Sequence, residues 1–267
     1  MNNEIWEDLK FFLERLKALP VSESLRLGNN GGFCVSTGCD LESWVYFPER
    51  VNDANIVNEA VKFFHERNIS FMWPIYEAGG EKVLESAGLV YAGNLEAMTL
   101  DSEKINLERA NEDVRILRVN NCADFDAGIG DVRNYSEANS TKIWARTAWH
   151  AFGGGVDDVE ENYYAFVSAL NNDRENLELY LAELDNEPVG TFLLTCEKNF
   201  AGVYYFGVIP ELRRKKIAAS MMNEICRLSR GKKIVLQATP SGVPFYEKFG
   251  FERLFTIRVY SNESDIF

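Results

Sequence analysis

The stretch Tyr205-Phe-Gly-Val-Ile-Pro-Glu-Leu-Arg-Arg-Lys-Lys-Ile-Ala-Ala-Ser220 carries more information about this chain than any other. It starts as an apolar strand pattern that ends at Pro210. Four consecutive cations follow at residues 213–216, and small residues at 218–220 then open an amphipathic helix pattern. A helix start presents unpaired backbone N–H groups and the positive end of the helix dipole. Because small side chains let a phosphate come close to that backbone, the pattern favours an anion site suited to a pyrophosphate.

The alternative interpretation of these cations is a solvated basic helix start. Cations at a helix N-terminus oppose the helix dipole, at a cost of about a few tenths of a kcal/mol or more each. The chain as a whole carries a formal net charge of −13, so a cluster of four cations is unusual in it. The sequence therefore favours the bound anion over the solvated helix.

The length, the net charge and the short apolar runs of the chain limit the classes of protein to which it can belong. The 267 residues are enough for one large domain or two small ones. The strong acidity argues against a nucleic-acid-binding protein, because phosphate contacts need a basic surface. No apolar run approaches the ~20 residues that a membrane helix needs, and residues 1–19 form an amphipathic helix pattern rather than a signal peptide.

The cysteines indicate a reducing compartment. There are five, an odd number with irregular spacing: Cys34, Cys39, Cys122, Cys196 and Cys226. We interpret them as free thiols and predict a cytoplasmic protein. Their spacing to the two histidines fits no usual zinc pattern, so no metal site is expected.

The order of predicted elements is typical of an α/β protein. Hydrophobic periodicity and turn residues define the elements. Helices are predicted at residues 4–18, 55–67, 81–87, 121–150 (with gaps), 160–170, 212–229 and 243–249. Strands are predicted at residues 33–37, 44–47, 69–73, 89–100, 114–119, 177–184, 189–197, 202–209, 234–238 and 251–260.

The two halves of the chain repeat the same order of elements. Pro48 corresponds to Pro210, and Pro74 corresponds to Pro240. A long repeat unit of this kind predicts two similar domains rather than a solenoid. The predicted boundaries are a first lobe at residues 1–100, a polar connector at 101–113 and a second lobe at 114–267.

The quoted stretch resembles the acetyl-CoA-binding motif of the GNAT acetyltransferase superfamily. In that family a V-x-P turn leads to R-x-x-G-x-G/A and a helix. Val208-Ile-Pro210 and Arg213-x-x-Lys216-x-Ala218 stand in the matching places, with Lys216 where the family usually has glycine. Downstream, Pro244-Phe-Tyr-Glu-Lys-Phe-Gly-Phe251 resembles the family's A-x-x-(F/L)-Y-x-K-x-G-F. The resemblance covers the whole second half of the chain. The first half resembles the family only weakly.

The resemblance implies a duplicated GNAT-like fold, a mixed and mostly antiparallel sheet flanked by helices. In such a fold the strands before Pro210 and Pro240 run parallel and splay apart, with pantetheine in the gap. The implied cofactor is acetyl-CoA, whose acetyl group is moved to an amine by direct attack through a tetrahedral intermediate. The implied cofactor-binding residues are Phe206, Gly207, Val208, Arg213, Arg214, Lys215, Lys216, Ile217, Ala218 and Ala219.

The resemblance also implies a catalytic residue and an acceptor side. Tyr246 stands at the family's tyrosine acid, and a phenol with a pKa of ~10 can protonate the leaving thiolate at neutral pH. The general base is not readable from the sequence, and its candidates stay open: Tyr204, Tyr205, Glu183 and Glu197. Trp144, Trp149 and Tyr205 are the candidate substrate-binding residues, with core packing as the alternative for the two tryptophans.

The first half of the chain lacks the residues implied in cofactor binding and catalysis. No cation cluster follows Pro48, and Leu84 stands at the position that corresponds to Tyr246. We therefore expect residues 1–100 to be catalytically silent. The expected partner is a small-molecule or peptide amine, with neither nucleic acid nor membrane involved; a homodimer stays open. The alternative function is a non-catalytic module with the GNAT fold that binds acyl-CoA or another protein.

Overall fold

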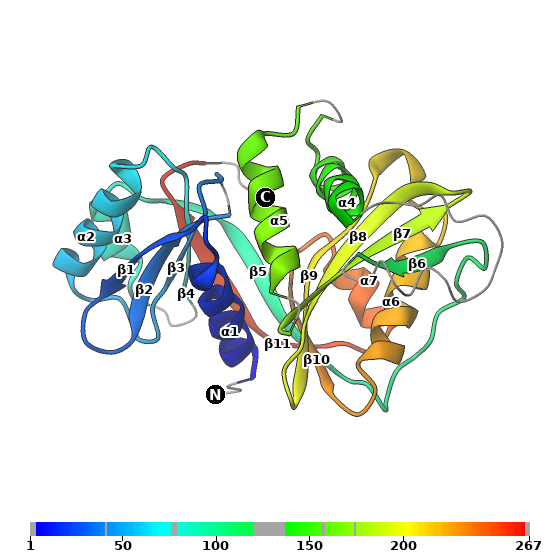
Figure 1. Ribbon diagram of the computed structural model, residues 1–267. Coiled ribbons are helices and arrows are strands. Elements are labelled where there is room, and N and C mark those ends of the chain that lie inside the picture. The colour runs from blue at the N-terminus through cyan, green and yellow to red at the C-terminus, as the bar shows by residue number, and fades with distance from the viewer. Residues whose placement is uncertain are drawn as a thin grey trace. The chain divides into compact units, whose positions relative to one another are not determined.

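The computed structural model describes residues 4–40, 42–75, 79–119, 137–155, 158–173 and 175–264, and its contacts divide the chain into two compact units (Figure 1). Unit 1 comprises Met1–Thr99, Gln237–Glu247 and Glu252–Phe267, and unit 2 comprises Leu100–Leu236 and Lys248–Phe251. This division differs from the predicted one, which placed all residues after 113 in the second lobe.

Unit 1 is a mixed sheet in the strand order β1-β2-β3-β4-β11-β5. All of its pairings are antiparallel except β3 with β4, which is parallel. Its strands are β1 (Glu23–Leu27), β2 (Gly32–Ser36), β3 (Trp44–Tyr46), β4 (Met72–Ile75), β5 (Val90–Asp101) and β11 (Glu252–Ser261). Its helices are α1 (Glu4–Ala18), α2 (Ala54–His65), α3 (Glu81–Ser86) and most of α7 (Val243–Lys248).

The last strand of the chain explains why the units differ from the predicted lobes. β11 pairs antiparallel with β4, through Val259 and Pro74 among others, and with β5 on its other side. Its alternating apolar pattern predicts a strand but does not say which sheet edge it joins. β11 therefore completes the sheet that holds the first part of the chain.

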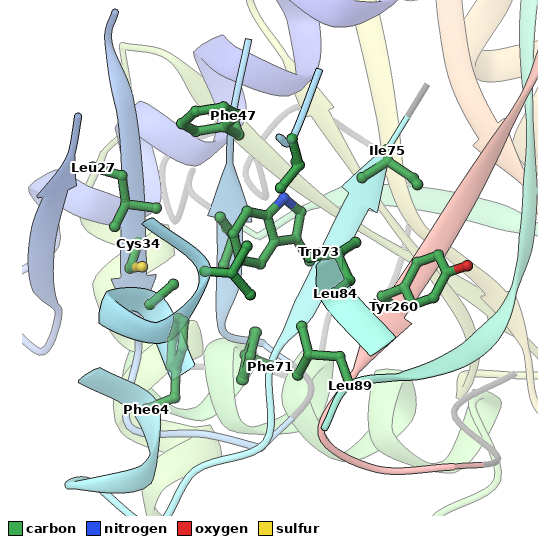
Figure 2. Packing of buried hydrophobic residues seen from close by; sticks show 14 of the residues in the cluster. Leu27, Cys34, Phe47, Phe64, Phe71, Trp73, Ile75, Leu84, Leu89 and Tyr260 are labelled. Carbon is green, nitrogen blue, oxygen red and sulfur yellow. The ribbon is translucent and has the colours of Figure 1, made fainter. Parts of the chain in front are cut away.

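Aromatic packing forms the core of unit 1 (Figure 2). Trp73 is fully buried at its centre and meets Phe47 edge-on, with ring centroids 6.4 Å apart. Phe64 of α2 stacks on Phe71 at 4.1 Å, so the helix is fixed to the sheet by ring contact as well as by buried area. Tyr260 of β11 belongs to the same cluster, which confirms that the last strand is part of this core.

Unit 2 repeats the arrangement with its own strands, in the order β10-β9-β8-β7-β6. β6, β7, β8 and β9 are antiparallel neighbours, whereas β10 runs parallel to β9. The strands are β6 (Arg115–Arg118), β7 (Leu177–Leu184), β8 (Glu187–Thr195), β9 (Phe200–Val208) and β10 (Lys233–Ala238). The helices are α4 (Glu137–Ala151), α5 (Glu161–Asn172), the 3-10 turn η2 (Pro210–Leu212) and α6 (Ile217–Leu228).

Helices cover both faces of the unit 2 sheet. A side chain added at Gly190 of β8 would meet Met221 of α6, whereas one added at Gly207 of β9 would meet Ala151 of α4. Gly207 pairs with Thr191, the neighbour of Gly190, and successive residues of a strand point to opposite faces. α6 and α4 therefore lie on opposite sides of β8 and β9.

The predicted fold class, a mixed and mostly antiparallel sheet with flanking helices, is confirmed in both units. The same order occurs twice along the chain: three consecutive antiparallel strands, a helix, a strand parallel to the last of the three, and a short helix. Three details differ from the sequence predictions. β1 was missed, β4 continues through Pro74, and α6 begins at Ile217 instead of residue 212. Residues 121–136 of the predicted helix at 121–150 lie outside the described residues.

Among the described residues, no helix is long and apolar enough to cross a membrane. Cys34, Cys39, Cys196 and Cys226 are free thiols, and Cys122 lies outside the described residues.

Candidate functional site

A bulge in β9 marks the region to which the sequence assigned the reaction. Between the pairs Leu193↔Tyr204 and Thr191↔Gly207, β9 has one residue more than β8. Tyr205 in this bulge has φ 49°, a left-handed conformation that is uncommon for a bulky residue, and its carbonyl accepts a bond from the Thr191 hydroxyl at 3.1 Å. Such a bulge bends the strand and changes the direction of the side chains after it.

After the bulge, the backbone of β9 directs an N–H group away from β8. The Ile209 N–H donates to the Val189 carbonyl of β8 at 3.0 Å. Because N–H groups alternate between the two sides of a strand, the Val208 N–H points to the opposite side. The parallel ladder with β10 on that side consists of four pairs and ends at Val203 and Leu236. The predicted parallel pairing of these strands is confirmed, and Val208 lies beyond its end.

The four cations form a loop between η2 and α6. Arg213 is extended (φ −60°, ψ 156°), Arg214 is left-handed (φ 66°), and Lys216 is left-handed (φ 61°, ψ 16°) and is the N-cap residue of α6. A backbone that alternates in hand turns successive N–H groups toward a common concavity, which is a frequent anion site. Lys216 therefore adopts the conformation for which the related motif uses glycine.

The first turn of α6 supplies further donors to this loop. The Ser220 N–H is bonded to the Lys216 carbonyl at 3.1 Å, so the N–H groups of residues 217–219 precede the helical ladder. Ile217 and Ala219 bury their side chains in the core, and Ala218 is half-buried. These predicted cofactor-binding residues can act only through their backbone, and the small Ala218 leaves that backbone accessible.

Arg213 makes two contacts that the sequence did not predict. Its Nε donates to the Val208 carbonyl at 3.1 Å and its Nη2 donates to the Ala151 carbonyl at 2.9 Å. The guanidinium therefore connects the loop to the end of β9 and to the last turn of α4. The side chains of Arg214, Lys215 and Lys216 are exposed, as is that of Arg213.

The end of α4 lies directly against β9. A Cβ at Gly207 would stand 2.9 Å from the Ala151 Cβ and 3.4 Å from the ring of Phe152. Phe152 is 63% exposed, so its ring lies at the surface beside the backbone of Gly207. Nothing in the sequence singles out Phe152, because a single aromatic residue at a helix end has no distinctive spacing.

His150 and Glu211 form a second contact between α4 and the loop region. The His150 Nε2 lies 3.0 Å from the Glu211 carboxylate, and its Nδ1 lies 3.1 Å from the Gly154 carbonyl. The Gly154 carbonyl, followed by the Glu211 carboxylate, raises the pKa of His150 above its ordinary value. The two residues are far apart in sequence, and no local pattern pairs them.

The predicted aromatic substrate wall is wrong for Trp144. Its side chain is fully buried, and its Nε1 donates to the Tyr180 carbonyl at 2.9 Å. Trp149 is half-buried, packs on Tyr163 of α5 at 5.2 Å and lies against Gly154. Core packing describes both tryptophans, while the half-buried Tyr205 meets Trp144 edge-on at 5.6 Å.

The candidate acid and the candidate bases lie in different environments. Desolvation raises the pKa of Tyr246 in α7, so its phenol keeps its proton well above neutral pH. Glu183 is buried, and its carboxylate accepts a hydrogen bond from Arg115 at 2.9 Å. Glu197 lies just after Thr195, the last residue of β8, whereas Gly190 lies near the other end of that strand.

The helix α2 provides an internal comparison for α6, because each follows the last of three consecutive antiparallel strands, β1 to β3 and β7 to β9. Its N-cap is Asp53, whose carboxylate accepts the Asn55 N–H at 2.8 Å. A carboxylate bound at this helix start satisfies an N–H donor and repels a second anion. The N-cap of α6 is a lysine with no side-chain cap bond. Of the two, only α6 has a helix start suited to a phosphate.

We predict that Gly207→Ala lowers the free energy of unfolding by ~1–3 kcal/mol, because the new methyl group overpacks the contact with Ala151. Ala151→Gly in the same chain removes the clashing methyl group, so the double mutant should regain part of the loss, with a coupling energy of about 0.5–3 kcal/mol. Urea unfolding of the four proteins of the cycle measures it. Strictly additive losses would contradict the contact.

We predict that Lys216→Gly raises the free energy of unfolding by up to ~1 kcal/mol, since glycine lacks the Cβ penalty of the left-handed region while it adds entropy to the unfolded chain. Lys215→Gly removes the same charge at the neighbouring position, where φ is not left-handed, and should lower the free energy by about 0.5–1 kcal/mol. Equal losses for both variants in thermal unfolding would exclude this account of Lys216.

Comparison with known proteins agrees with this geometry. Residues 175–253 match the family model described as "Acetyltransferase (GNAT) domain". No curated protein matches the chain in sequence. A GCN5-related N-acetyltransferase from Kribbella flavida is similar in structure, with a TM-score of 0.63 and 13% identity over 96% of this chain and 95% of that chain.

Two further solved structures share the fold over nearly the whole chain. A GCN5-related N-acetyltransferase from Sphaerobacter thermophilus gives a TM-score of 0.58 at 13% identity, over 97% of this chain and 88% of that one. A protein described as "Tandem GNAT protein from the clavulanic acid biosynthesis pathway (without AcCoA)" gives 0.56 at 9% identity, over 97% and 95%. Identities this low show the fold alone. This chain thus has the fold of the GCN5-related N-acetyltransferases, and residues 175–253 in its second half match the model of the GNAT domain.

Proposed function

We propose that this chain is an N-acetyltransferase that moves an acetyl group from acetyl-CoA to an amine. The observation that carries the proposal is the loop at residues 213–216, with its alternating backbone hand, its exposed cations and its position before α6. It lies inside the segment that matches the GNAT domain, a family of acyl-transfer enzymes. The proposed location is the cytoplasm, with which the free thiols of the described cysteines agree.

The residues of unit 2 fit the polar end of acetyl-CoA. We assign the pyrophosphate to the backbone N–H groups of residues 214–219, with Arg214, Lys215 and Lys216 as neutralising charges. Arg213 holds the loop in place through its two carbonyl contacts. A bound anion offsets the electrostatic cost of placing these cations at a helix N-terminus.

The pantetheine and thioester are assigned to the end of β9. A backbone group of Phe206 would bond the pantetheine, and the exposed ring of Phe152, beside Gly207, would cover it from the side of α4. The Val208 N–H, which points away from β8, would polarise the thioester carbonyl when the tetrahedral intermediate forms. The Val208 carbonyl already accepts a bond from Arg213, which holds this part of the strand.

Proton transfer completes the proposed reaction. The amine must be neutral when it attacks, and the departing thiolate needs a proton. We assign that proton to Tyr246, whose raised pKa keeps it protonated throughout the range in which an amine can react. The first part of the chain is proposed to be catalytically silent, in agreement with the carboxylate of Asp53 at the start of α2.

We expect calorimetric titration with acetyl-CoA to give a dissociation constant in the micromolar range. Arg214→Ala combined with Lys215→Ala should weaken binding at least ~10-fold, because charge-assisted contacts contribute about 1.5–3 kcal/mol each when buried by the ligand. The matched control, Lys104→Ala with Arg109→Ala, removes two exposed cations of the connector and should leave the constant unchanged.

Desulfo-CoA should bind about as well as acetyl-CoA, since it keeps the pyrophosphate and most of the pantetheine. No binding of acetyl-CoA at millimolar concentration would refute the proposal and leave a protein-interaction module. Binding that survives in Arg214→Ala, Lys215→Ala would move the cofactor away from the α6 loop.

We expect Tyr246→Phe to lower kcat by ~10²-fold or more, the usual contribution of a positioned general acid, with unchanged acetyl-CoA affinity. Thiol release with the best acceptor from a panel of polyamines, amino acids, aminoglycosides and lysine peptides measures kcat. Phe245→Leu, which alters the neighbouring ring in contact with Tyr246, is the control and should lower kcat by much less. Unchanged turnover in Tyr246→Phe would remove the acid role.

A further inference from the structure

Two side-chain contacts connect the cofactor loop region to the last turn of α4. The first is the guanidinium of Arg213, which donates to the Ala151 carbonyl at 2.9 Å. The second is His150, whose Nε2 meets the Glu211 carboxylate at 3.0 Å. Glu211 belongs to η2, directly before the loop, so both contacts act on the same short segment.

The two contacts differ in their dependence on protons. Arg213 keeps its charge at every accessible pH, and its bond is made to a carbonyl at the C-terminal end of a helix, where a cation is favoured. His150 faces an oxygen acceptor at each ring nitrogen, the Gly154 carbonyl at 3.1 Å and the Glu211 carboxylate. Only an imidazolium donates from both nitrogens, so a neutral His150 must lose one of these bonds.

The position of these contacts relates them to the proposed reaction. His150 and Ala151 are neighbours at the end of α4, and Phe152 follows them with its ring beside Gly207. Whatever holds this turn against the loop also fixes the distance between Phe152 and β9. The contact of His150 with Glu211 is therefore part of what shapes the proposed thioester site.

We propose that His150 is a positioning residue of the acyl-transfer site, which in its doubly protonated form holds Glu211 and the cofactor loop against the end of α4. The inference rests on the proposed function for its consequence, but its structural basis is this pair of contacts. Arg213 provides the permanent part of the connection, and His150 provides the part that responds to pH.

The charges around His150 determine the direction of that response. Glu211 faces it from η2 and Arg213 from the loop, Arg146 precedes it by one turn on α4, and Asp158 lies on the segment that leads to α5. The raised pKa of His150 shows that the acceptors prevail over Arg213. A histidine with a raised pKa makes its contact fully below its unfolded value of ~6.5, and loses it as the pH rises through the higher folded value.

The affinity for CoA should therefore fall as the pH rises through this window. Calorimetric titration of the full chain with CoA between pH 5.5 and 8.5 measures it for the wild type, His150→Gln and Glu211→Gln. The ratio of variant to wild-type affinity at each pH cancels the titration of the phosphates of CoA itself. We expect wild-type affinity to fall ~2- to 5-fold more over this range than that of either variant, a modest effect because the ion pair is exposed to solvent.

The controls separate positioning from general structural damage. Arg213→Lys should weaken CoA binding about equally at every pH, because the contact that it alters does not titrate. Glu211→Gln changes an exposed carboxylate, so it tests the pair even if His150→Gln folds poorly. The double variant should show no pH effect beyond that of either single variant.

Each outcome has a separate meaning. Parallel pH profiles for the wild type and both variants would overturn the role of His150 and leave the proposed function intact. Failure of the wild type to bind CoA at any pH would overturn the proposed function together with this inference. A flattened profile in both variants supports the positioning role.

Discussion

The close approach of α4 to β9 at Gly207 is the constraint on which the candidate site depends. Only a residue without a side chain leaves room there for Ala151 and the ring of Phe152. That approach also brings the Ala151 carbonyl within reach of Arg213, and His150 within reach of Glu211. The absence of a side chain at Gly207 thus allows the end of α4, the strand β9 and the loop at residues 213–216 to contact one another.

The two units show how one arrangement of elements can differ in chemistry at a single position. Each has a helix after the last of three consecutive antiparallel strands, with the positive end of the dipole at its start. At α2 this end is satisfied by the carboxylate of Asp53, and at α6 it is surrounded by lysine and arginine. The charge of the residues before the helix, and not the architecture, determines whether an anion can be bound.

The sequence predicted most of the local structure and little of the long-range contact. Strand and helix patterns, the end of a strand before Pro210 and the repeated order of elements are all properties of neighbouring residues, which periodicity and turn chemistry record. The left-handed backbone conformation of Lys216 could be anticipated, because the related motif usually has glycine at this position. The bulge at Tyr205, the pair of His150 and Glu211, and the carbonyl contacts of Arg213 depend on residues brought together only by folding. Trp144 was misjudged for a related reason, since an aromatic side chain on a helix has the same spacing whether it lines a site or packs in a core.

The place of β11 has a consequence for the order in which the chain can acquire its structure. During synthesis the first ninety-nine residues emerge with β1 to β4, which are neighbours in the sheet, and with most of β5, but β4 and β5 have β11 between them in the finished sheet. The edge of β4 therefore stays open until residues 252–261 leave the ribosome. An open strand edge can pair with another chain, so this unit carries an association hazard throughout translation that a contiguous domain would not have. For the same reason, a fragment that stops before residue 252 is an unfinished sheet and not an isolated lobe.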